Sequence, residues 1–351
     1  MTAGESVPAG LGVFGALYGW VGARRRARYR RQPGLTRRLG QPVISVGNLT
    51  VGGSGKTPLV IALAAALREA GERPAILSRG YARRGSAAGV VVVSDGERVR
   101  VPVEESGDEP QVMARRLPGV PVLVGRERYE AGLVAERDFG CTVHLLDDGF
   151  QHLRLARDID LLVLSATDAG GRVLPAGRLR EPIAAAWQAD AWLTAESPDA
   201  VRAAFASSAH RAAGGQVDPP AFALTTRVRE TRRLSPFGTA ADVTPGAAIA
   251  VSGIARPERF LASARAAGWR IERELRFRDH HWFSDADWRD VTEAARAAGA
   301  VVLTTEKDAV RLEPLQQRAA ASVPVLYLPI DVDVPIELLT WLAARLAECR
   351  A

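Results

Sequence analysis

The chain has 351 residues, 47% of them hydrophobic and 25% charged, a composition typical of a protein with an ordinary soluble core and one large or two medium domains. Its net charge of +6 is concentrated in residues 1–40, where eight arginines accompany one glutamate, so the rest of the chain sums to −1. This distribution argues against a broadly basic, nucleic-acid-coating protein and for one basic contact zone near the N-terminus. Cys141 and Cys349 lack metal or redox spacing, which excludes a disulfide scaffold and favours a reduced, cytosolic setting.

Residues 7–23 form an apolar run rich in glycine and aromatic side chains, and an arginine-rich segment, residues 24–31, follows at once. The run is shorter than the roughly 20 residues that span a bilayer, and its positive charge follows the apolar part instead of preceding it as in a signal peptide. We therefore expect residues 1–35 to form an amphipathic helix at a membrane interface, with its arginines on anionic lipid. The alternative is a helix that docks on the protein's own core.

The segment between residues 42 and 68 predicts a buried strand, a glycine-rich turn and a helix. Val43–Val46 supplies the strand and Pro58–Arg68 the helical run. The junction matches a P-loop at six positions, Gly52, Gly53, Ser54, Gly55, Lys56 and Thr57. In a P-loop, backbone N–H groups and the helix N-terminus bind phosphate, the lysine reaches the terminal phosphates and the hydroxyl ligates Mg²⁺. Thr50 replaces the usual leading glycine, so the alternative of a glycine-rich loop without a ligand stays open.

Residue usage supports the same site. Arginine occurs 44 times, whereas lysine occurs only at Lys56 and Lys307 and asparagine only at Asn48. Such a bias is typical of GC-rich coding, under which arginine replaces lysine wherever either would serve. A compact ammonium differs from a planar guanidinium at a phosphate site, so the remaining lysines are candidate functional residues.

Strands and helices alternate from residue 73 to residue 189. We expect strands at Arg73–Tyr81, Val120–Val124 and Ile159–Leu164, a hairpin across Gly89–Val103, a polar loop at Glu104–Pro110, and helices from about Gln111, up to Glu136 and around Ala184–Ala189. This alternation predicts a mostly parallel sheet whose sites lie at the carboxyl edge.

A second informative strand runs through residues 141–147 and ends in Asp147 and Asp148. Carboxylates at the end of a strand that follows a P-loop fit a Walker-B arrangement, in which they orient Mg²⁺ and its waters. A pair of aspartates in a turn is common and by itself indicates little. Its position some ninety residues after the P-loop makes the Walker-B interpretation stronger.

A second α/β unit is expected from residue 221. It would contain strands near Phe222–Arg229, Ala247–Ser252, Trp269–Phe277, Val301–Thr305 and Val323–Leu328, helices near Pro257–Ala267 and from Asp285, a loop at Glu306–Asp308 and a closing helix. Residues 207–220 have the composition of a linker. The expected fold is thus an α/β, P-loop NTPase-like core at 36–220 with helices on both faces of its sheet, a smaller α/β domain at 221–351 that closes over the site, and the N-terminal helix.

Seven short motifs in order along the chain resemble the tetraacyldisaccharide 4'-kinase family, and together they cover it from residue 46 to residue 309. They are V-G-N-L-T-V-G-G-S-G-K-T-P at 46–58, S-R-G-Y at 78–81, G-D-E-P at 107–110, D-D-G-F-Q-H at 147–152, L-R-E-P at 179–182, F-R-D-H-H at 277–281 and T-E-K-D-A at 305–309. The resemblance implies an enzyme that transfers the γ-phosphate of ATP, with Mg²⁺, to the 4'-hydroxyl of a tetraacyldisaccharide 1-phosphate in lipid A biosynthesis.

The same resemblance implies residue roles. It makes Asp108 the base at the sugar hydroxyl, paired with His280, with Lys56 on the phosphates, and it leaves His281 as an alternative to His280. Residues carried over as substrate or metal-shell contacts are Asn48, Tyr81, Arg126, His152, Arg180 and Glu181. We expect a monomer at the cytoplasmic face of the inner membrane that binds no nucleic acid.

Two other functions are compatible with parts of the sequence. A regulatory P-loop NTPase would share Gly52–Thr57 and Asp147, although Lys307 is displaced by one position from the guanine-reading N-K-x-D pattern. Nucleotide preference and turnover without lipid would identify it. A membrane-tethered binding module would show no ATP dependence.

Overall fold

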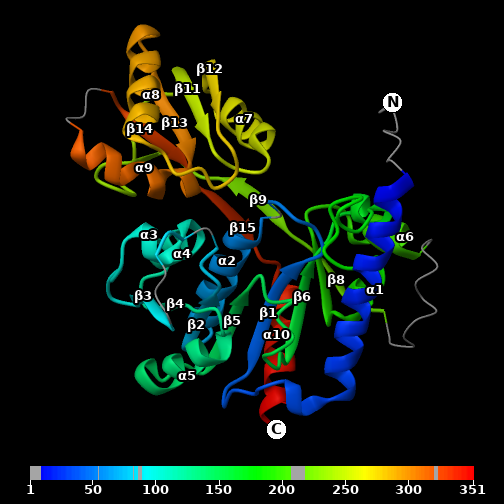
Figure 1. The fold of residues 1–351 in the computed structure, drawn as a ribbon. Helices are drawn as coiled ribbons and strands as arrows, with labels where there is room; N and C mark the ends of the chain where they lie inside the picture. Colours follow the sequence, from blue (N-terminus) through cyan, green and yellow to red (C-terminus); the bar gives the residue numbers. More distant parts are fainter. Residues whose placement is uncertain (1–8, 54, 82, 86–88, 207–217, 320–322) are drawn as a thin grey trace.

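A computed structural model describes residues 9–53, 55–81, 83–85, 89–206, 218–319 and 323–351. The chain forms two α/β domains, drawn one above the other in Figure 1 with the strands β9 and β15 between them. Most of the expected linker, residues 207–217, and Ser54 of the P-loop lie outside the described residues.

The larger domain is built on an eight-stranded sheet with strand order β3-β4-β2-β5-β1-β6-β7-β8. All neighbouring pairs are parallel except β3 with β4. The strands are β1 (Val43–Asn48), β2 (Pro74–Ser78), β3 (Val91–Asp95), β4 (Pro121–Val124), β5 (Val143–Asp147), β6 (Ile159–Val163), β7 (Ala191–Thr194) and β8 (Ala221–Ala223). The central strands β1 and β5 are mostly apolar and buried along their whole length, because helices cover both faces of the sheet.

Helices of this domain form separate apolar cores on the two faces. On one face α2 (Lys56–Glu69), α4 (Asp108–Arg116) and α10 (Ile336–Arg350) contribute to one cluster, and on the other α5 (Arg128–Phe139) packs on β2 and β4. The remaining helical segments are η1 (Pro33–Leu35), α3 (Val103–Ser106), η2 (Ala166–Gly170), η3 (Ile183–Gln188) and α6 (Pro198–Ala206). The expected parallel α/β core is therefore confirmed.

The smaller domain has a five-stranded sheet with strand order β10-β14-β13-β11-β12, parallel except at β10. Its strands are β10 (Arg232–Arg233), β11 (Ala247–Ser252), β12 (Arg270–Arg276), β13 (Val301–Thr305) and β14 (Val325–Leu328), and its helices are α7 (Pro257–Ala266), α8 (Asp285–Ala297) and α9 (Glu306–Arg318). Helices α8 and α9 bury one face of the sheet and α7 the other.

The connection between the domains differs from the expectation. The single strand expected at 222–229 is two strands, because β8 joins the larger sheet while β9 (Thr225–Val228) pairs antiparallel with β15 (Ile330–Asp333). After β15 the chain returns, and Leu338, Leu342 and Leu346 of α10 pack into the core of the larger domain. The chain therefore crosses between the domains twice, and residues 334–351 pack with the first domain although the sequence assigned them to the second.

Three local expectations are also corrected. The polar loop at 104–110 is largely helical, because α3 and α4 meet at Gly107, whose φ of +86° turns the chain between them. The loop at 306–308 is the first turn of α9, capped by Thr305, whose hydroxyl accepts a hydrogen bond from the Asp308 N–H. The hairpin at 89–103 keeps only its first strand, since a single bridge between Ser94 and Val99 forms its return.

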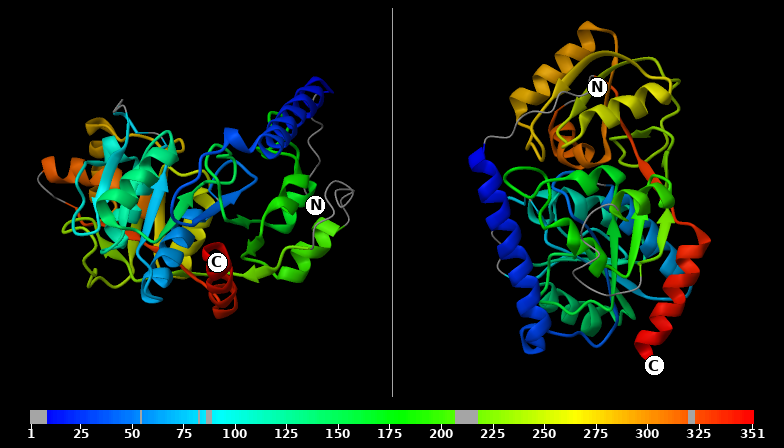
Figure 2. Two further views of the ribbon diagram at one scale, coloured as in Figure 1. Left: turned by 90° about the horizontal axis from the view of Figure 1, so that it is seen from below. Right: turned by 90° about the vertical axis from the view of Figure 1, so that its right-hand side faces the viewer.

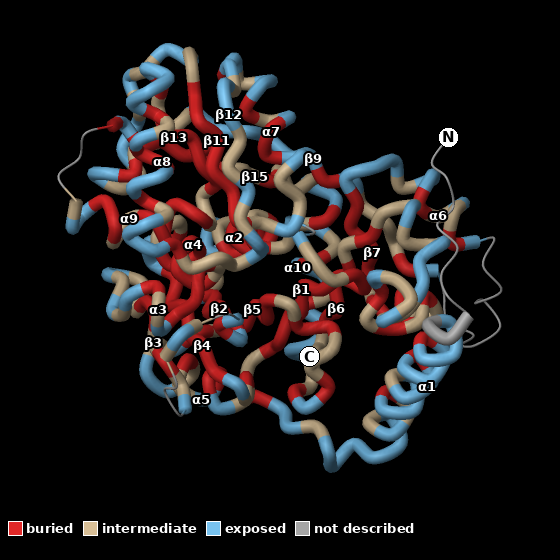
Figure 3. Tube along the Cα trace, turned by 45° about the horizontal axis from the view of Figure 1, so that its top comes forward, coloured by how far each residue is buried: buried red, intermediate tan, exposed pale blue. Residues whose placement is uncertain are grey.

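The N-terminal helix α1 (Ala9–Arg31) lies along one side of the larger domain (Figures 1 and 2). Its contact is a ridge of glycines: a Cβ at Gly15 would lie 3.2 Å from Ala176, and one at Gly19 would lie 3.3 Å from Pro182. The apolar side chains between the glycines stay exposed, as the pale blue trace in Figure 3 shows. Polarity thus changes along the described helix, from an apolar part to an arginine-rich end, and the two-faced amphipathic pattern that we expected is not confirmed.

Candidate active site

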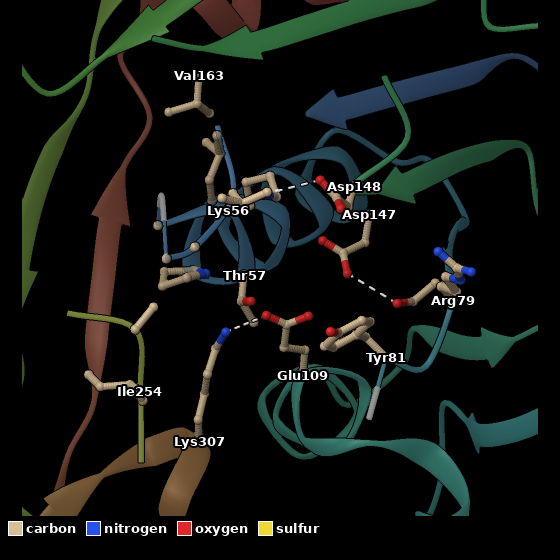
Figure 4. A pocket seen from close by; sticks show the side chains of 18 of the residues that line it. Lys56, Thr57, Arg79, Tyr81, Glu109, Asp147, Asp148, Val163, Ile254 and Lys307 are labelled. Atoms are coloured by element: carbon tan, nitrogen blue, oxygen red, sulfur yellow. Dashed lines mark hydrogen bonds and ion pairs between the residues drawn. The ribbon is translucent and has the colours of Figure 1, made fainter. Parts of the chain in front are cut away.

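A cavity of about 1310 Å³ opens between the domains at the carboxyl edge of the larger sheet. The larger domain contributes the P-loop, the end of β5 and the start of α4. The smaller domain contributes the segments around Ile254 and Lys307, which Figure 4 shows, and the segment around His280. Tyr18, Val21 and Arg25 of α1 line its outer part. The groups that a bound ligand would meet here therefore come from both domains, from α1 and from the connecting strands β9 and β15.

The described glycines of the P-loop turn the chain into α2. Gly52 and Gly55 have φ of +95° and +77°, values that favour glycine, and α2 begins at Lys56. A Cβ at Gly52 would also lie 2.7 Å from the Arg178 guanidinium, which donates a hydrogen bond to the Val51 carbonyl. Backbone N–H groups at the N-terminus of α2 are thereby directed at the cavity, where they suit an anion.

The partners of Lys56 at the cavity include Asn48 and Asp148. Its ammonium donates to Asn48 Oδ1 at 2.7 Å and lies 3.2 Å from Asp148 Oδ1. The Asn48 amide in turn donates to the Thr50 carbonyl at 2.9 Å and is fully buried. The structure thus places Asn48 as a support for the Lys56 ammonium, and the expected contact of Asn48 with substrate stays a prediction.

The two aspartates after β5 have different surroundings. Asp148, with φ of +52°, accepts from Arg180 at 2.6 Å as well as contacting Lys56, and these cations outweigh burial and lower its pKa. Asp147 accepts one hydrogen bond, from Ser78 Oγ at 3.1 Å, and burial together with the charges of Glu109 and Asp148 raises its pKa to about 7. Asp147 is thus a buried carboxyl group facing other carboxylates, a position that a cation would stabilise.

The donor set near Asp147 fits Mg²⁺. The Thr57 hydroxyl and the Asp147 carboxylate are hard oxygen donors that line the same cavity (Figure 4). Among the described residues no group of three or more His, Cys, Asp or Glu side chains is arranged to hold a metal. Mg²⁺ in a kinase site takes few protein ligands and completes its shell with water and phosphate, so two donors are sufficient.

Asp108 and His280, 172 positions apart, meet across the domain boundary. His280 Nδ1 lies 3.0 Å from Asp108 Oδ2, and Arg311 from α9 lies 3.4 Å from the same oxygen. Burial favours the neutral acid, but the hydrogen bond from His280 and the charge of Arg311 outweigh it and lower the pKa of Asp108 to about 2. Burial would lower the pKa of His280, yet Asp108 raises it above the usual value. The pair is therefore ionic at mildly acidic pH, with Asp108 a carboxylate throughout.

His281 occupies a different position. Its Nε2 lies 3.0 Å from Asp287 Oδ2, its ring stacks on Phe277 at 4.8 Å, and it is not part of the cavity lining. His280 has φ of +56°, in the left-handed region, and its ring packs edge-on against Tyr81 at 5.1 Å. Of the two histidines, only His280 reaches Asp108.

The remaining expected contacts also gather at the cavity. Tyr81 and Arg126 are exposed at its wall, and Arg180 reaches in from the segment that docks α1. Burial and the charge of Arg128 lower the pKa of His152 to about 3, so this imidazole is neutral. Glu181 is buried against Arg26 of α1 at 2.5 Å, which ties the N-terminal helix to the cavity wall.

Sequence reasoning missed Glu109 and Arg311 as site residues and assigned no role to Lys307. Glu109 stands in the G-D-E-P motif beside Asp108, whereas Arg311 follows one helical turn after the T-E-K-D motif. In the sequence, only their proximity to these motifs pointed to them. Their contacts at the site depend on how α4 packs against α9, which the sequence pattern does not show.

A P-loop beside paired carboxylates, with an Asp–His pair completed by a second domain, defines a P-loop phosphotransferase. The chain belongs to the tetraacyldisaccharide-1-P 4'-kinase family, whose model matches residues 8–347. It is 42% identical over 309 residues to the tetraacyldisaccharide 4'-kinase of Anaeromyxobacter dehalogenans (strain 2CP-C), covering 85% of this chain and 79% of that protein. It is 41% identical over 319 residues to the enzyme of Geobacter metallireducens, covering 88% of this chain and 89% of that protein.

A solved structure shares the fold. The "apo" form of LpxK from Aquifex aeolicus in complex with ATP is 31% identical and superposes with a TM-score of 0.73, covering 95% of this chain and 97% of that one. These comparisons give no support to a regulatory NTPase without a lipid substrate.

Proposed function

We propose that this protein transfers the γ-phosphoryl group of ATP to the 4'-hydroxyl of a tetraacyldisaccharide 1-phosphate, giving lipid IVA in lipid A biosynthesis. The observation that carries the proposal is the contact between Asp108 and His280, because His280 lines the same cavity as Lys56 and Thr57. A nucleotide phosphate on the P-loop and a sugar hydroxyl at Asp108 would share this space.

Each residue has a role that follows from its surroundings. The P-loop N–H groups and Lys56 bind the phosphates, and Thr57 with Asp147 would hold Mg²⁺, which supplies positive charge to the phosphate oxygens when bound. Asp148 is already engaged by Lys56 and Arg180, so it positions these two cations. This assignment favours Asp147 over Asp148 as the direct metal ligand.

Asp108 acts by orienting the nucleophile. A carboxylate with a pKa of about 2 is a weak base, but a loose phosphoryl-transfer transition state needs positioning more than early deprotonation. Asp108 accepts the hydrogen bond of the 4'-hydroxyl, and His280 and Arg311 fix the direction of its oxygens. The bond between the γ-phosphorus and the bridging oxygen breaks, that oxygen leaves with ADP, and the hydroxyl proton passes to Asp108 late, as the new P–O bond to the sugar forms.

The cavity wall suits an anionic sugar lipid. Arg126 and Tyr81 are exposed beside His152 and Arg180, and we assign this group to the disaccharide and its 1-phosphate. Glu181 connects the group to α1 through Arg26. Tyr18 and Val21 line the outer part of the cavity together with Arg25, and in this assignment these two side chains lie nearest the acyl chains.

We further propose that α1 binds the membrane surface at the cytoplasmic face of the inner membrane. Phe14, Leu17 and Trp20 are 61%, 55% and 57% exposed, which is unusual for large apolar side chains, and arginines follow them. No helix in the described part of the chain has the length and apolarity that crossing a bilayer requires. An interfacial helix explains the exposed side chains and the nearby arginines together.

The experiment is phosphate transfer from radiolabelled ATP to purified tetraacyldisaccharide 1-phosphate in detergent micelles. The proposal expects labelled lipid that depends on enzyme, Mg²⁺ and acceptor. ATP hydrolysis at the same rate without the acceptor would instead favour a regulatory NTPase.

A further inference from the structure

Lys307 is the second residue of α9 in the smaller domain, and its side chain crosses to the larger domain. Its ammonium donates to Glu109 Oε1 on α4. Figure 4 shows it entering the cavity toward Thr57 and Glu109, on a different side from Lys56. The only two lysines of the chain therefore line one cavity, in a protein that uses arginine 44 times.

The surroundings of Lys307 are strongly acidic. Burial disfavours its ammonium form, but the charges of Glu109, Asp108 and Asp147 outweigh burial and raise its pKa. Lys307 is thus a permanent cation facing the groups that surround the P-loop threonine, and a phosphate chain bound at the P-loop would lie within this field.

Neighbouring contacts between α4 and α9 show what is particular about Lys307. Two other ion pairs join these helices, Arg115 with Glu313 at 2.5 Å and Arg116 with Glu306 at 3.1 Å, and both use arginine. Arg115 and Glu313 lie outside the cavity lining, whereas Lys307 is within it. Arginine is therefore sufficient for an ion pair between the domains. The lysine at position 307 lies instead where phosphate would bind, and there its compact ammonium differs from a guanidinium.

We propose that Lys307 is a second phosphate-binding cation of the nucleotide site, which leaves Glu109 and contacts the terminal phosphate of ATP when nucleotide enters. The inference rests on the proposed function, because it needs ATP on the P-loop. Lys56 belongs to the larger domain and Lys307 to the smaller one, so the terminal phosphate meets both cations only while the domains are docked. Charge neutralisation is thereby coupled to the same docking that joins His280 to Asp108.

The test compares nucleotide binding by the full-length enzyme, its K307M and K307R variants, and the control E313Q, which breaks an ion pair between the same helices outside the cavity. Affinities for a non-hydrolysable ATP analogue and for ADP, both with Mg²⁺, are measured by calorimetry, and kcat is measured separately. One lost charged hydrogen bond weakens binding of the analogue about 10- to 100-fold in K307M. ADP, which lacks the terminal phosphate, should bind K307M within about twofold of wild type.

K307R keeps the charge but replaces the compact ammonium, so it should recover only part of the affinity for the analogue, and E313Q should bind both nucleotides as wild type does. The inference is overturned if K307M binds the analogue as tightly as wild type, or if its affinities for the analogue and for ADP fall by the same factor. It is also overturned if the affinity of E313Q for the analogue falls as far as that of K307M. Lipid phosphorylation by the wild-type enzyme is scored independently. If no lipid is phosphorylated, the proposed function is refuted, but the comparison between the ATP analogue and ADP still tests whether Lys307 binds the terminal phosphate.

Discussion

Removal of Asp108, His280 or both tests whether the two residues act as one unit. Asp108 is 3% exposed and is held by His280 at 3.0 Å and by Arg311 at 3.4 Å. In the H280A variant Arg311 still contacts Asp108, so the carboxylate stays ionised. It is no longer held in one orientation, because the hydrogen bond from His280 is lost. Without Asp108, His280 has no carboxylate to orient.

Positioned acid–base groups contribute about 10²- to 10⁴-fold to rate, so we expect D108A and H280A each to lower kcat by that factor. The double variant should fall no further, which corresponds to a coupling free energy of about 3–5 kcal/mol. Affinity for ATP should change little, because neither side chain contacts the P-loop. The assay is steady-state phosphate transfer to the disaccharide in micelles, with calorimetry for ATP.

H281A is the matched control, since His281 contacts Asp287 and Phe277 away from the cavity. Its kcat should stay within about twofold of wild type. The reasoning would be refuted if the losses of D108A and H280A multiplied in the double variant, or if H281A were damaging while H280A were silent.

Three further predictions concern the phosphate site, the helix and pH. Both K56A and D147A should lower turnover by orders of magnitude, because each group acts on phosphate charge in a buried site; full activity of either would remove the P-loop assignment. Replacing the exposed Phe14 and Trp20 by serine should weaken binding to anionic vesicles and leave the thermal midpoint unchanged, whereas the buried-contact variant R26M should lower the midpoint. A fall in the midpoint of the F14S/W20S variant would favour a helix that only docks on the core. The contribution of the Asp108–His280 pair to the free energy of unfolding should be lost as pH falls through the lowered Asp108 pKa of about 2, and lost again as pH rises through the raised His280 pKa. The difference between wild type and H280A in urea unfolding should therefore be largest between about pH 4 and 6.5, and a difference independent of pH would contradict the ionic pair.

Local features of the site were predictable from sequence because they depend on neighbours in the chain. The strand, the glycine turn and the helix at 43–68 follow from apolar periodicity and from glycines at positive φ, as observed at Gly52 and Gly55. The aspartates at 147 and 148 follow in the same way, from a buried strand that ends in carboxylates. The start of α9 was also predictable, because a threonine three residues before an acidic side chain is a typical N-terminal cap, as Thr305 is here. The prediction of a loop at 306–308 overlooked this signal.

Contacts between distant segments were not predictable from pattern alone. Nothing in the periodicity brings Asp108 to His280, and only family resemblance paired them. The return of α10 to the larger domain was missed because an apolar helix face gives no sign of which core it will join. The glycine ridge of α1 was missed for a related reason, since its small side chains have meaning only against Ala176 and Pro182.

The central claim, phosphate transfer to the 4'-hydroxyl, is tested most directly by the structure of the product. The enzyme is incubated with ATP, Mg²⁺ and tetraacyldisaccharide 1-phosphate, and the product is examined by phosphorus NMR and mass spectrometry while ADP is counted. We predict one new phosphomonoester at the 4' position and one ADP for each lipid phosphorylated. ADP released without a phosphorylated lipid, or a phosphate attached at another hydroxyl, would contradict the account.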